Sequence, residues 1–163
     1  MNVKEAIAAI GHSYTEITGL CCYFVQDEIE ISSAKEKNFF CKCLKTSQSA
    51  LEHCEECTLE NYKQALNSNK VQTYSCHAGL VKWSVPVVMK DVKGVIISEG
   101  VISKRQIEES NTWIEYLSKK YNIDANVLLK IYNQVKQMTE EQVNQSIHLL
   151  EALIDYYRTQ IDE

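Results

Sequence analysis

The sequence predicts an α+β fold in which a small antiparallel sheet is flanked by helices and followed by a long C-terminal helix. Three observations support this. Apolar residues recur at helical spacing near the N-terminus, alternate over residues 80–89, and return to helical spacing after residue 103. The predicted order is helix, strand, helices, antiparallel strands and then helices. The 163 residues are enough for one domain with a core of its own.

The N-terminal segment is predicted to form a helix over residues 3–18, because its apolar residues fall on one helical face. Gly19 ends this helix. Residues 20–25 are apolar and rich in β-forming side chains, which predicts a short buried strand. The polar segment 26–37 follows, and we expect a second short strand at 29–31 and then a loop.

Two further helices are expected before the main sheet. Residues 38–45 look like a short aromatic helix, and the pattern at 49–52 matches a capping box that begins a helix over residues 49–67. Cys54 and Cys57 lie three residues apart on that helix and therefore share one face.

The centre of the chain is predicted to contribute three strands. Residues 71–76 form the first, and a tight connection at 77–79 leads to the second, over 80–89. Alternation in the second strand places Val81, Trp83, Val85, Val87 and Met89 on one face, and Lys82, Ser84 and Pro86 on the other. Pro86 favours a sheet edge or a bulge. Residues 92–102 then complete a hairpin.

The C-terminal third is predicted to be helical. Capping boxes at 103–106 and 139–142 begin two helices, and Asp124 caps another between them. The last helix carries an apolar stripe with heptad spacing, made of Val143, Ile147, Leu150, Ile154, Tyr157 and Ile161. This stripe has two readings: it packs on its own domain, or it dimerises as a signalling helix.

Charge and composition exclude several classes of protein. With 17 Lys and Arg against 22 Asp and Glu, the net charge is −5 and no basic stripe is present, so direct nucleic-acid binding is not expected. We see neither a signal peptide nor an apolar run long enough to cross a membrane. The expected location is the cytoplasm, where the seven cysteines stay reduced.

Four of the cysteines are candidate metal ligands. Cys41, Cys54, Cys57 and Cys76 come from separate predicted elements, and a bound metal would favour their convergence. Four thiolates suit zinc or an iron–sulfur cluster of the [4Fe–4S] type. Glu55 and Glu56 favour a metal over a bare reactive thiolate, because their charge raises the pKa of nearby thiols.

The alternative is that these cysteines are small buried hydrophobic residues. That reading is preferred for Cys21, Cys22 and Cys43, which lie in apolar segments. His77 has three readings, as a metal ligand, a ligand-binding residue or a turn residue. Phe40, Tyr74 and Trp83 are candidates for lining a ligand pocket beside it, although aromatic residues at such spacings also form ordinary core.

The segment Cys76-His77-Ala78-Gly79-Leu80 resembles the PocR-type sensor domain of bacterial and archaeal signalling proteins. The likeness extends over residues 5–103 and includes Phe40-Cys41, the Cys54 and Cys57 pair, and Val85-Pro86-Val87. Cys41, Cys54, Cys76 and His77 match the motif positions of that family. One departure is Val101, where many members carry glutamine.

The resemblance implies a PAS-like fold that senses small hydrocarbon derivatives, such as short alcohols or diols. It predicts a sensor domain over 1–138 and a signalling or dimerisation helix over 139–163. The signal, a small molecule or redox state detected through the cysteine site, would pass to an output domain or partner protein, and the chain would not be an enzyme. Two alternatives stay open: a zinc-stabilised interaction module, and a cysteine-dependent enzyme with His77 as base.

Overall fold

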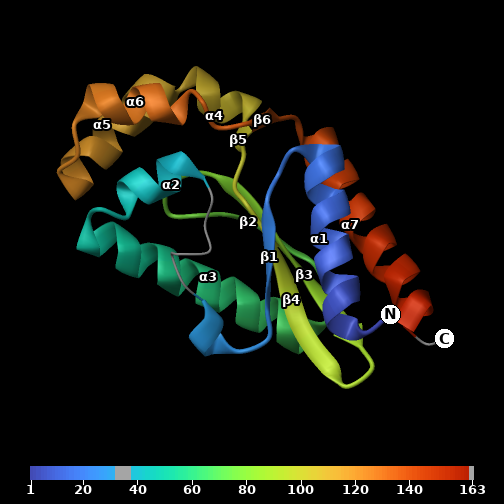
Figure 1. Cartoon of the computed structure of the whole chain (residues 1–163). Coiled ribbons are helices and arrows are strands. Elements are labelled where there is room, and N and C mark those ends of the chain that lie inside the picture. Colours follow the sequence, from blue (N-terminus) through green and yellow to red (C-terminus); the bar gives the residue numbers. More distant parts are fainter. Residues whose placement is uncertain (32–37, 162–163) are drawn as a thin grey trace.

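An antiparallel sheet with helices on both faces forms the centre of the computed structural model (Figure 1). The structure describes residues 1–31 and 38–161. In this part of the chain the main sheet has the strand order β1-β4-β3-β2. Its strands are β1 (Cys22–Val25), β2 (Gln72–Ser75), β3 (Val81–Met89) and β4 (Val92–Ser98). Two short strands, β5 (Ile102–Ser103) and β6 (Gln137–Met138), pair in parallel beside it. The predicted α+β class is confirmed.

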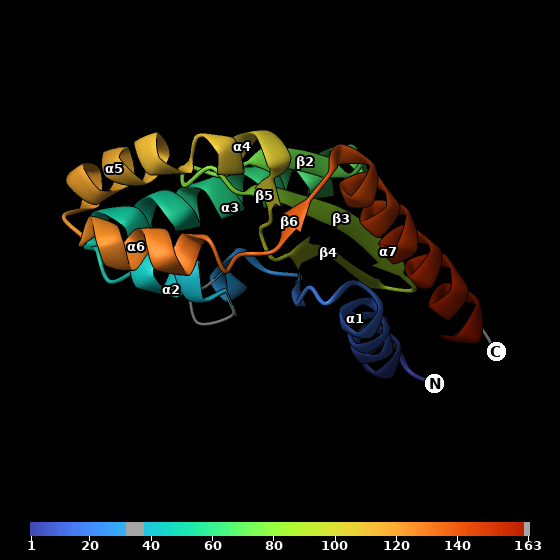
Figure 2. The ribbon, with the colours of Figure 1, turned by 90° about the horizontal axis from the view of Figure 1, so that it is seen from above.

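The helices form two layers and a cap at one end. Helices α1 and α7 lie side by side on one face of the sheet, α3 lies on the other, and α2, α5 and α6 gather at one end (Figures 1 and 2). Their bounds are α1 (Val3–Thr18), α2 (Phe39–Leu44), α3 (Gln48–Ser68), α4 (Lys104–Glu108), α5 (Ser110–Tyr121), α6 (Ala125–Tyr132) and α7 (Glu140–Ile161).

Local sequence signals account for the ends of these helices. Asn2 and Glu5 form a reciprocal capping box that begins α1, and Gly19 ends it in the left-handed conformation with φ 75°. Thr139 and Gln142 form the capping box predicted before α7, with backbone-to-side-chain distances of 2.9 and 3.1 Å.

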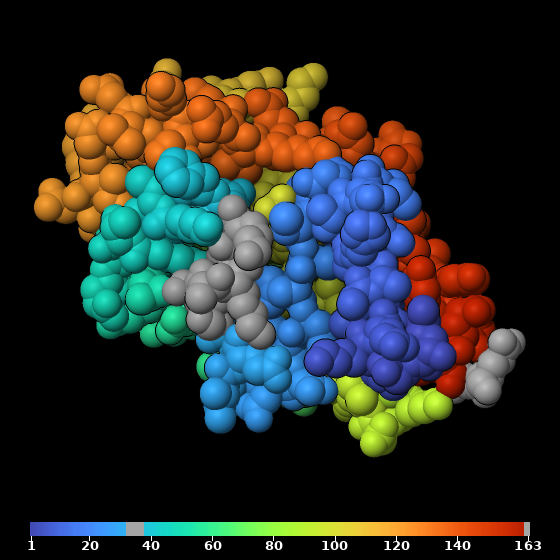
Figure 3. All heavy atoms as spheres, in the orientation of Figure 1, coloured from blue at the N-terminus to red at the C-terminus, as the bar shows by residue number. Residues whose placement is uncertain are grey.

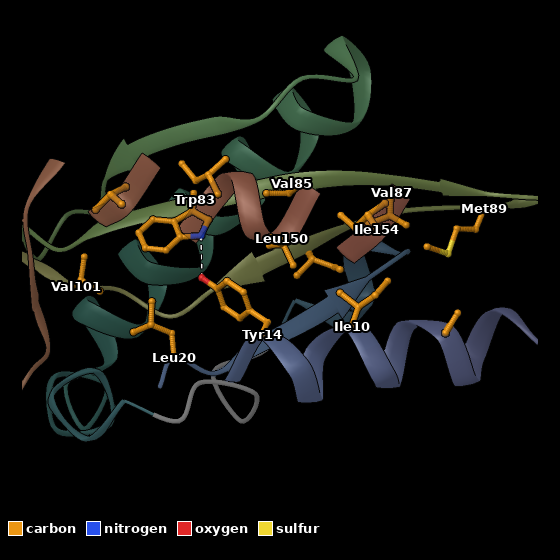
Figure 4. Packing of buried hydrophobic residues seen from close by; sticks show 14 of the residues in the cluster. Ile10, Tyr14, Leu20, Trp83, Val85, Val87, Met89, Val101, Leu150 and Ile154 are labelled. Carbon is orange, nitrogen blue, oxygen red and sulfur yellow. Dashed lines mark hydrogen bonds between the residues drawn. The ribbon is translucent and has the colours of Figure 1, made fainter. Parts of the chain in front are cut away.

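The largest core cluster lies between the sheet and the pair α1 and α7. Trp83, Val85, Val87 and Met89 alternate along β3 and point into this cluster, where they meet Ile10, Tyr14, Leu150 and Ile154 (Figure 4). The Trp83 indole N–H donates to the Tyr14 hydroxyl at 3.1 Å, and that hydroxyl hydrogen bonds Ser98 at 2.8 Å. The predicted alternation of β3 is therefore confirmed.

Two smaller clusters complete the interior. Val95 and Ile97 of β4 pack against Tyr62 and Ala65 of α3 on the opposite face of the sheet. The third cluster joins α2 with α5 and α6, and it includes the edge-on contact of Phe40 with Tyr132 at 5.1 Å between ring centroids. In the space-filling view, α6 packs directly on α2 (Figure 3).

Several predicted elements differ from those observed. Glu28–Glu30 form a 3-10 turn capped by Asp27, and no strand forms at 29–31. Helix α3 is capped by Ser47 and not from Ser49, because the Ser47 hydroxyl accepts from the Ala50 amide. The helix predicted from 103 breaks at Glu109 into α4 and α5. Residues 32–37 of the predicted loop, and the last two residues of the predicted final helix, lie outside the described residues.

Pro86 lies on β3, which is an inner strand of the sheet. Pairing of β3 with β2 ends at Ser84, opposite Gln72, whereas pairing with β4 continues through Pro86 to Met89. At Pro86, therefore, none of the described strands pairs with β3 on the side away from β4. A residue without an N–H fits there without losing a ladder hydrogen bond.

The apolar stripe of α7 packs within its own chain. Val143, Ile147, Leu150, Ile154 and Ile161 are buried in the same cluster as α1 and β3, and Tyr157 packs at its border. This matches the reading in which the heptad stripe belongs to the core of the domain. Among the described helices, none has the length and apolar character that a membrane span requires.

Candidate functional site

One cavity gathers most of the predicted site residues. It is lined by Tyr23, Ile31, Cys41, Leu44, Lys45, Cys54, Glu55, Cys57, Thr58, Tyr74, Cys76, His77, Ala78 and Lys82. Its volume of ≈ 30 Å³ exceeds the roughly 10–15 Å³ that one water molecule needs. A molecule of a few non-hydrogen atoms fits this space.

Three segments far apart in the sequence bring the four predicted cysteines to this cavity. Cys41 lies on α2, Cys54 and Cys57 lie on α3, and Cys76 follows β2. The spacing of three residues places Cys54 and Cys57 on the same face of α3, as predicted. The convergence expected from the sequence is therefore observed as a shared lining.

A tight turn over residues 76–79 presents His77 to the cavity. The Cys76 amide donates to the Leu80 carbonyl at 2.8 Å, and the Gly79 amide donates to the Cys76 carbonyl at 2.9 Å. Gly79 has φ 85°, and a Cβ there would lie 2.8 Å from Nε1 of Trp113 on α5. That Trp113 N–H donates to the Ala78 carbonyl at 2.8 Å, so α5 holds the turn in place.

His77 is the centre of a chain of polar contacts. Its Nε2 lies 2.7 Å from Cys54 Sγ, and its Nδ1 lies 2.9 Å from the Tyr121 hydroxyl. The same hydroxyl lies 2.9 Å from Nδ1 of His53. Cys54 and His53 are neighbours on α3, and Tyr121 ends α5. The chain therefore ties the turn to two helices.

The surroundings of His77 favour its neutral form. Burial first, and then the nearby charges of His53, Lys120, Lys45 and Lys82, together lower the pKa of His77 to about 4. At neutral pH the imidazole is therefore uncharged, so one of its ring nitrogens donates a hydrogen bond and the other accepts one.

We expect acid to destabilise the fold through His77. Between pH 6.5 and about 4 the unfolded chain binds a proton at this residue that the folded chain does not, so the free energy of unfolding falls as the pH falls through this window. His77→Gln should flatten this part of the profile, measured by urea unfolding across the window. His148→Gln, on the exposed side of α7, is the matched control. Equal slopes for His77→Gln and the wild type would contradict the prediction.

The wall formed by β2 and β3 carries a buried cation and a buried phenol. Lys82 is only 6% exposed, and the Tyr74 hydroxyl is buried without a hydrogen-bond partner of good geometry among the described residues. Burial raises the pKa of Tyr74, while the charge of Lys82 acts in the opposite direction. Burial also raises the pKa of the Cys57 thiol. Lys82 and Tyr74 of this wall, and Cys57 on α3, therefore offer proton donors to an occupant of the cavity.

Phe40 and Trp83, which were predicted to contact ligand, do not line the cavity. Phe40 points from α2 into the cluster with Tyr132, and its neighbour Cys41 takes the place at the cavity. Trp83 points into the α1 and α7 cluster because adjacent residues of a strand face opposite sides of the sheet. Its neighbour Lys82 is the one that faces the cavity.

The predicted metal would need its ligands to converge on one point. Zinc requires its thiolates to converge at about 2.3 Å from the ion. Over residues 1–31 and 38–161, no group of three or more His, Cys, Asp or Glu side chains is placed to hold a metal ion. The arrangement does not fit zinc or an iron–sulfur cluster as it stands. Metal binding by the four cysteines stays a prediction from the sequence.

Comparison with known families gives a match over nearly the whole chain. A model described as the sensory domain found in PocR matches residues 3–160. The chain belongs to the PocR sensory-domain family. It is thus a sensory domain, and the match covers α1 and nearly all of α7. Searches of the curated proteins and of the solved structures gave no match.

Three residues in or beside the PocR cavity had no role in the site predicted from the sequence: Lys82 lines the cavity, and Tyr121 and His53 belong to the chain of contacts through His77. The position of Lys82 could have been predicted, because a lysine that alternates with apolar residues in a strand lies on the face opposite to those residues. Tyr121 had no such signal, since its contact with His77 spans 44 residues. His53 adjoins Cys54 in the sequence, and the structure places it against the Tyr121 hydroxyl.

Proposed function

We propose that this PocR domain senses a small polar molecule in the cavity between α2, α3 and the turn at residues 76–79. The observation that carries the proposal is the contact of Cys54 with His77 at the cavity wall, which joins two separate elements. The lining mixes thiols with Lys82 and Tyr74, so the ligand needs polar atoms. The cavity volume of ≈ 30 Å³ favours a ligand as small as a short alcohol or diol.

A route for the signal follows from the alternation of β3. Lys82 faces the cavity, and Trp83 beside it packs in the cluster shared by α1 and α7. A ligand that moves Lys82 would therefore shift the packing of α7 through one strand. Such a shift requires different affinity for two states of the domain. In this proposal α7 passes the change to an output domain or partner.

We expect Lys82→Met to weaken ligand binding about tenfold or more, because a hydrogen bond to a charged group is worth about 1.5–3 kcal/mol. The matched control is Lys93→Met, which makes the same change at an exposed position of β4. Isothermal titration calorimetry with a panel of short alcohols and diols measures the effect. Equal affinity of the two variants for a compound that binds the wild type would place the site elsewhere.

Metal occupancy is the competing proposal, supported by the four cysteines that share the lining. Metal analysis and a visible spectrum of protein purified without oxygen distinguish the two. Near-stoichiometric zinc or iron in the wild type, lost in Cys54→Ala, would show that the thiols rearrange around a metal. Protein that binds the small molecule without stoichiometric metal would support the cavity as a direct ligand site.

A further inference from the structure

The chain of contacts through His77 can run in two directions of proton donation, and one of them makes His77 Nε2 the acceptor from Cys54. If the Cys54 thiol donates to Nε2, then the Nδ1 proton of His77 donates to the Tyr121 oxygen, and the Tyr121 proton donates to Nδ1 of His53. Every donor in this chain then has an acceptor. A thiol beside a neutral imidazole, with a third group orienting the ring, is the arrangement that activates a nucleophile.

The nucleophile in this arrangement is Cys54 and not Cys76. Cys76 precedes His77 in the turn, where its amide and carbonyl are used by Leu80 and Gly79. The imidazole reaches across to α3 and meets Cys54 at 2.7 Å. Two elements of the fold therefore meet to form a thiol–base pair that the linear sequence does not show.

Lys82 and Tyr74, from β3 and β2, line the same cavity as Cys54 and supply what a polarised electrophile needs. Lys82 is buried at 6% exposure, and the hydroxyl of Tyr74 is also buried. Donors of this kind stabilise an oxygen on which negative charge develops. A nucleophilic sulfur and proton donors in one lining match the needs of the two atoms of a carbonyl group, its carbon and its oxygen.

We propose that Cys54 captures a small aldehyde as a reversible thiohemiacetal, which deepens and rests on the small-molecule sensing proposed above. The sulfur forms a bond to the carbonyl carbon as the C=O π bond breaks. The thiol proton passes to His77 Nε2 and then to the former carbonyl oxygen, which becomes a hydroxyl. No atom leaves, and no oxidant or reductant is needed.

Reversibility suits a sensor more than a catalyst. The addition creates no leaving group, so the same path in reverse releases the aldehyde unchanged. The cavity volume of ≈ 30 Å³ favours the smallest members of the class. Formation of the C–S bond would replace the contact between Cys54 and His77, which links α3 to the turn. Capture therefore has a direct structural consequence.

The probe for the test is acetaldehyde labelled with ¹³C at its carbonyl carbon. We expect the wild type to give a ¹³C signal of a thiohemiacetal, and Cys54→Ser to lose it. Cys43→Ser is the matched control, because Cys43 lies on α2 but does not line the cavity. Acetaldehyde should also slow alkylation of Cys54 by iodoacetamide, followed by peptide mass spectrometry, and leave alkylation of Cys43 unchanged.

The variant His77→Gln tests whether His77 acts as a base or has only a structural role. Loss of a general base slows proton transfer by about 100-fold or more. Capture and release should both slow by this factor, while the fraction captured at equilibrium changes much less. A variant with the wild-type rates would remove His77 from the step.

Ethanol distinguishes failure of this proposal from failure of the proposed function. In one outcome ethanol binds the wild type, Lys82→Met weakens that binding, and acetaldehyde gives no signal that depends on Cys54. The small-molecule site then stands, and covalent capture is wrong. If neither compound binds, both proposals fall. A Cys54 that resists iodoacetamide and carries stoichiometric metal would also overturn the capture proposal.

Discussion

Replacing Trp83 with alanine is expected to lower the free energy of unfolding by about 3–5 kcal/mol. The side chain is 0% exposed and lies at the centre of the cluster between β3, α1 and α7 (Figure 4). Its removal leaves a cavity that the rigid sheet and two long helices cannot fill. The Tyr14 hydroxyl also loses the indole N–H that donates to it at 3.1 Å.

Urea unfolding followed by circular dichroism measures this loss. Val88→Ala on the same strand is the control, since Val88 is 38% exposed and should cost less than about 1 kcal/mol. The result also decides between two roles for Trp83. A variant with wild-type stability but weakened ligand binding would restore the prediction, made from the sequence, that Trp83 contacts the ligand.

The fold was largely predictable where the signals are local. The spacing of apolar residues located α1, the alternation from Trp83 to Met89 located β3, and Thr139 with Gln142 located the start of α7. The sequence pattern gave a wrong prediction where two local structures compete for the same residues. At Glu28–Glu30 the side chain of Asp27 caps a 3-10 turn, which removes the expected strand.

The sequence predicted which cysteines lie at the candidate site but not which side chains contact one another there. The spacing of cysteines indicated that Cys41, Cys54, Cys57 and Cys76 converge, and they do line one cavity. The partner of His77 could not be predicted, because the contact with Cys54 spans 23 residues and depends on how the turn sits against α3. Alternation placed Lys82 and Trp83 on opposite faces, but no local signal tells which face carries a cavity.

The heptad spacing of α7 is a second case in which a local pattern could not predict the packing partner. Leu150 and Ile154 satisfy both a coiled-coil seam and a helix that packs on a sheet, since the two patterns differ little over so few turns. Packing against α1 and β3 decides in favour of the core. Dimerisation through α7 would then have to use residues outside this stripe, such as Tyr156, which is 57% exposed.

Gly94→Ala is expected to destabilise the domain by about 3 kcal/mol, at the upper end of the cost of overpacking. A Cβ on Gly94 would lie 2.5 Å from the Val25 carbonyl oxygen and 2.6 Å from the Phe24 ring. The carbonyl belongs to the backbone of β1, which pairs with β4 along its length, so it cannot move without breaking that ladder. Relief would require β1 to separate from the sheet.

Gly11→Ala makes the same substitution, but it is expected to raise the free energy of unfolding. Gly11 lies inside α1, and its added Cβ would meet only Cys22 Sγ, at an ordinary contact distance of 3.7 Å. Alanine is favoured over glycine inside a helix by about 0.5–1 kcal/mol, so this variant should be more stable than the wild type. Urea unfolding of both variants measures the contrast. A loss below about 1 kcal/mol in Gly94→Ala would mean that β1 yields to the added methyl group, and that the β1–β4 pairing is less rigid than its register implies.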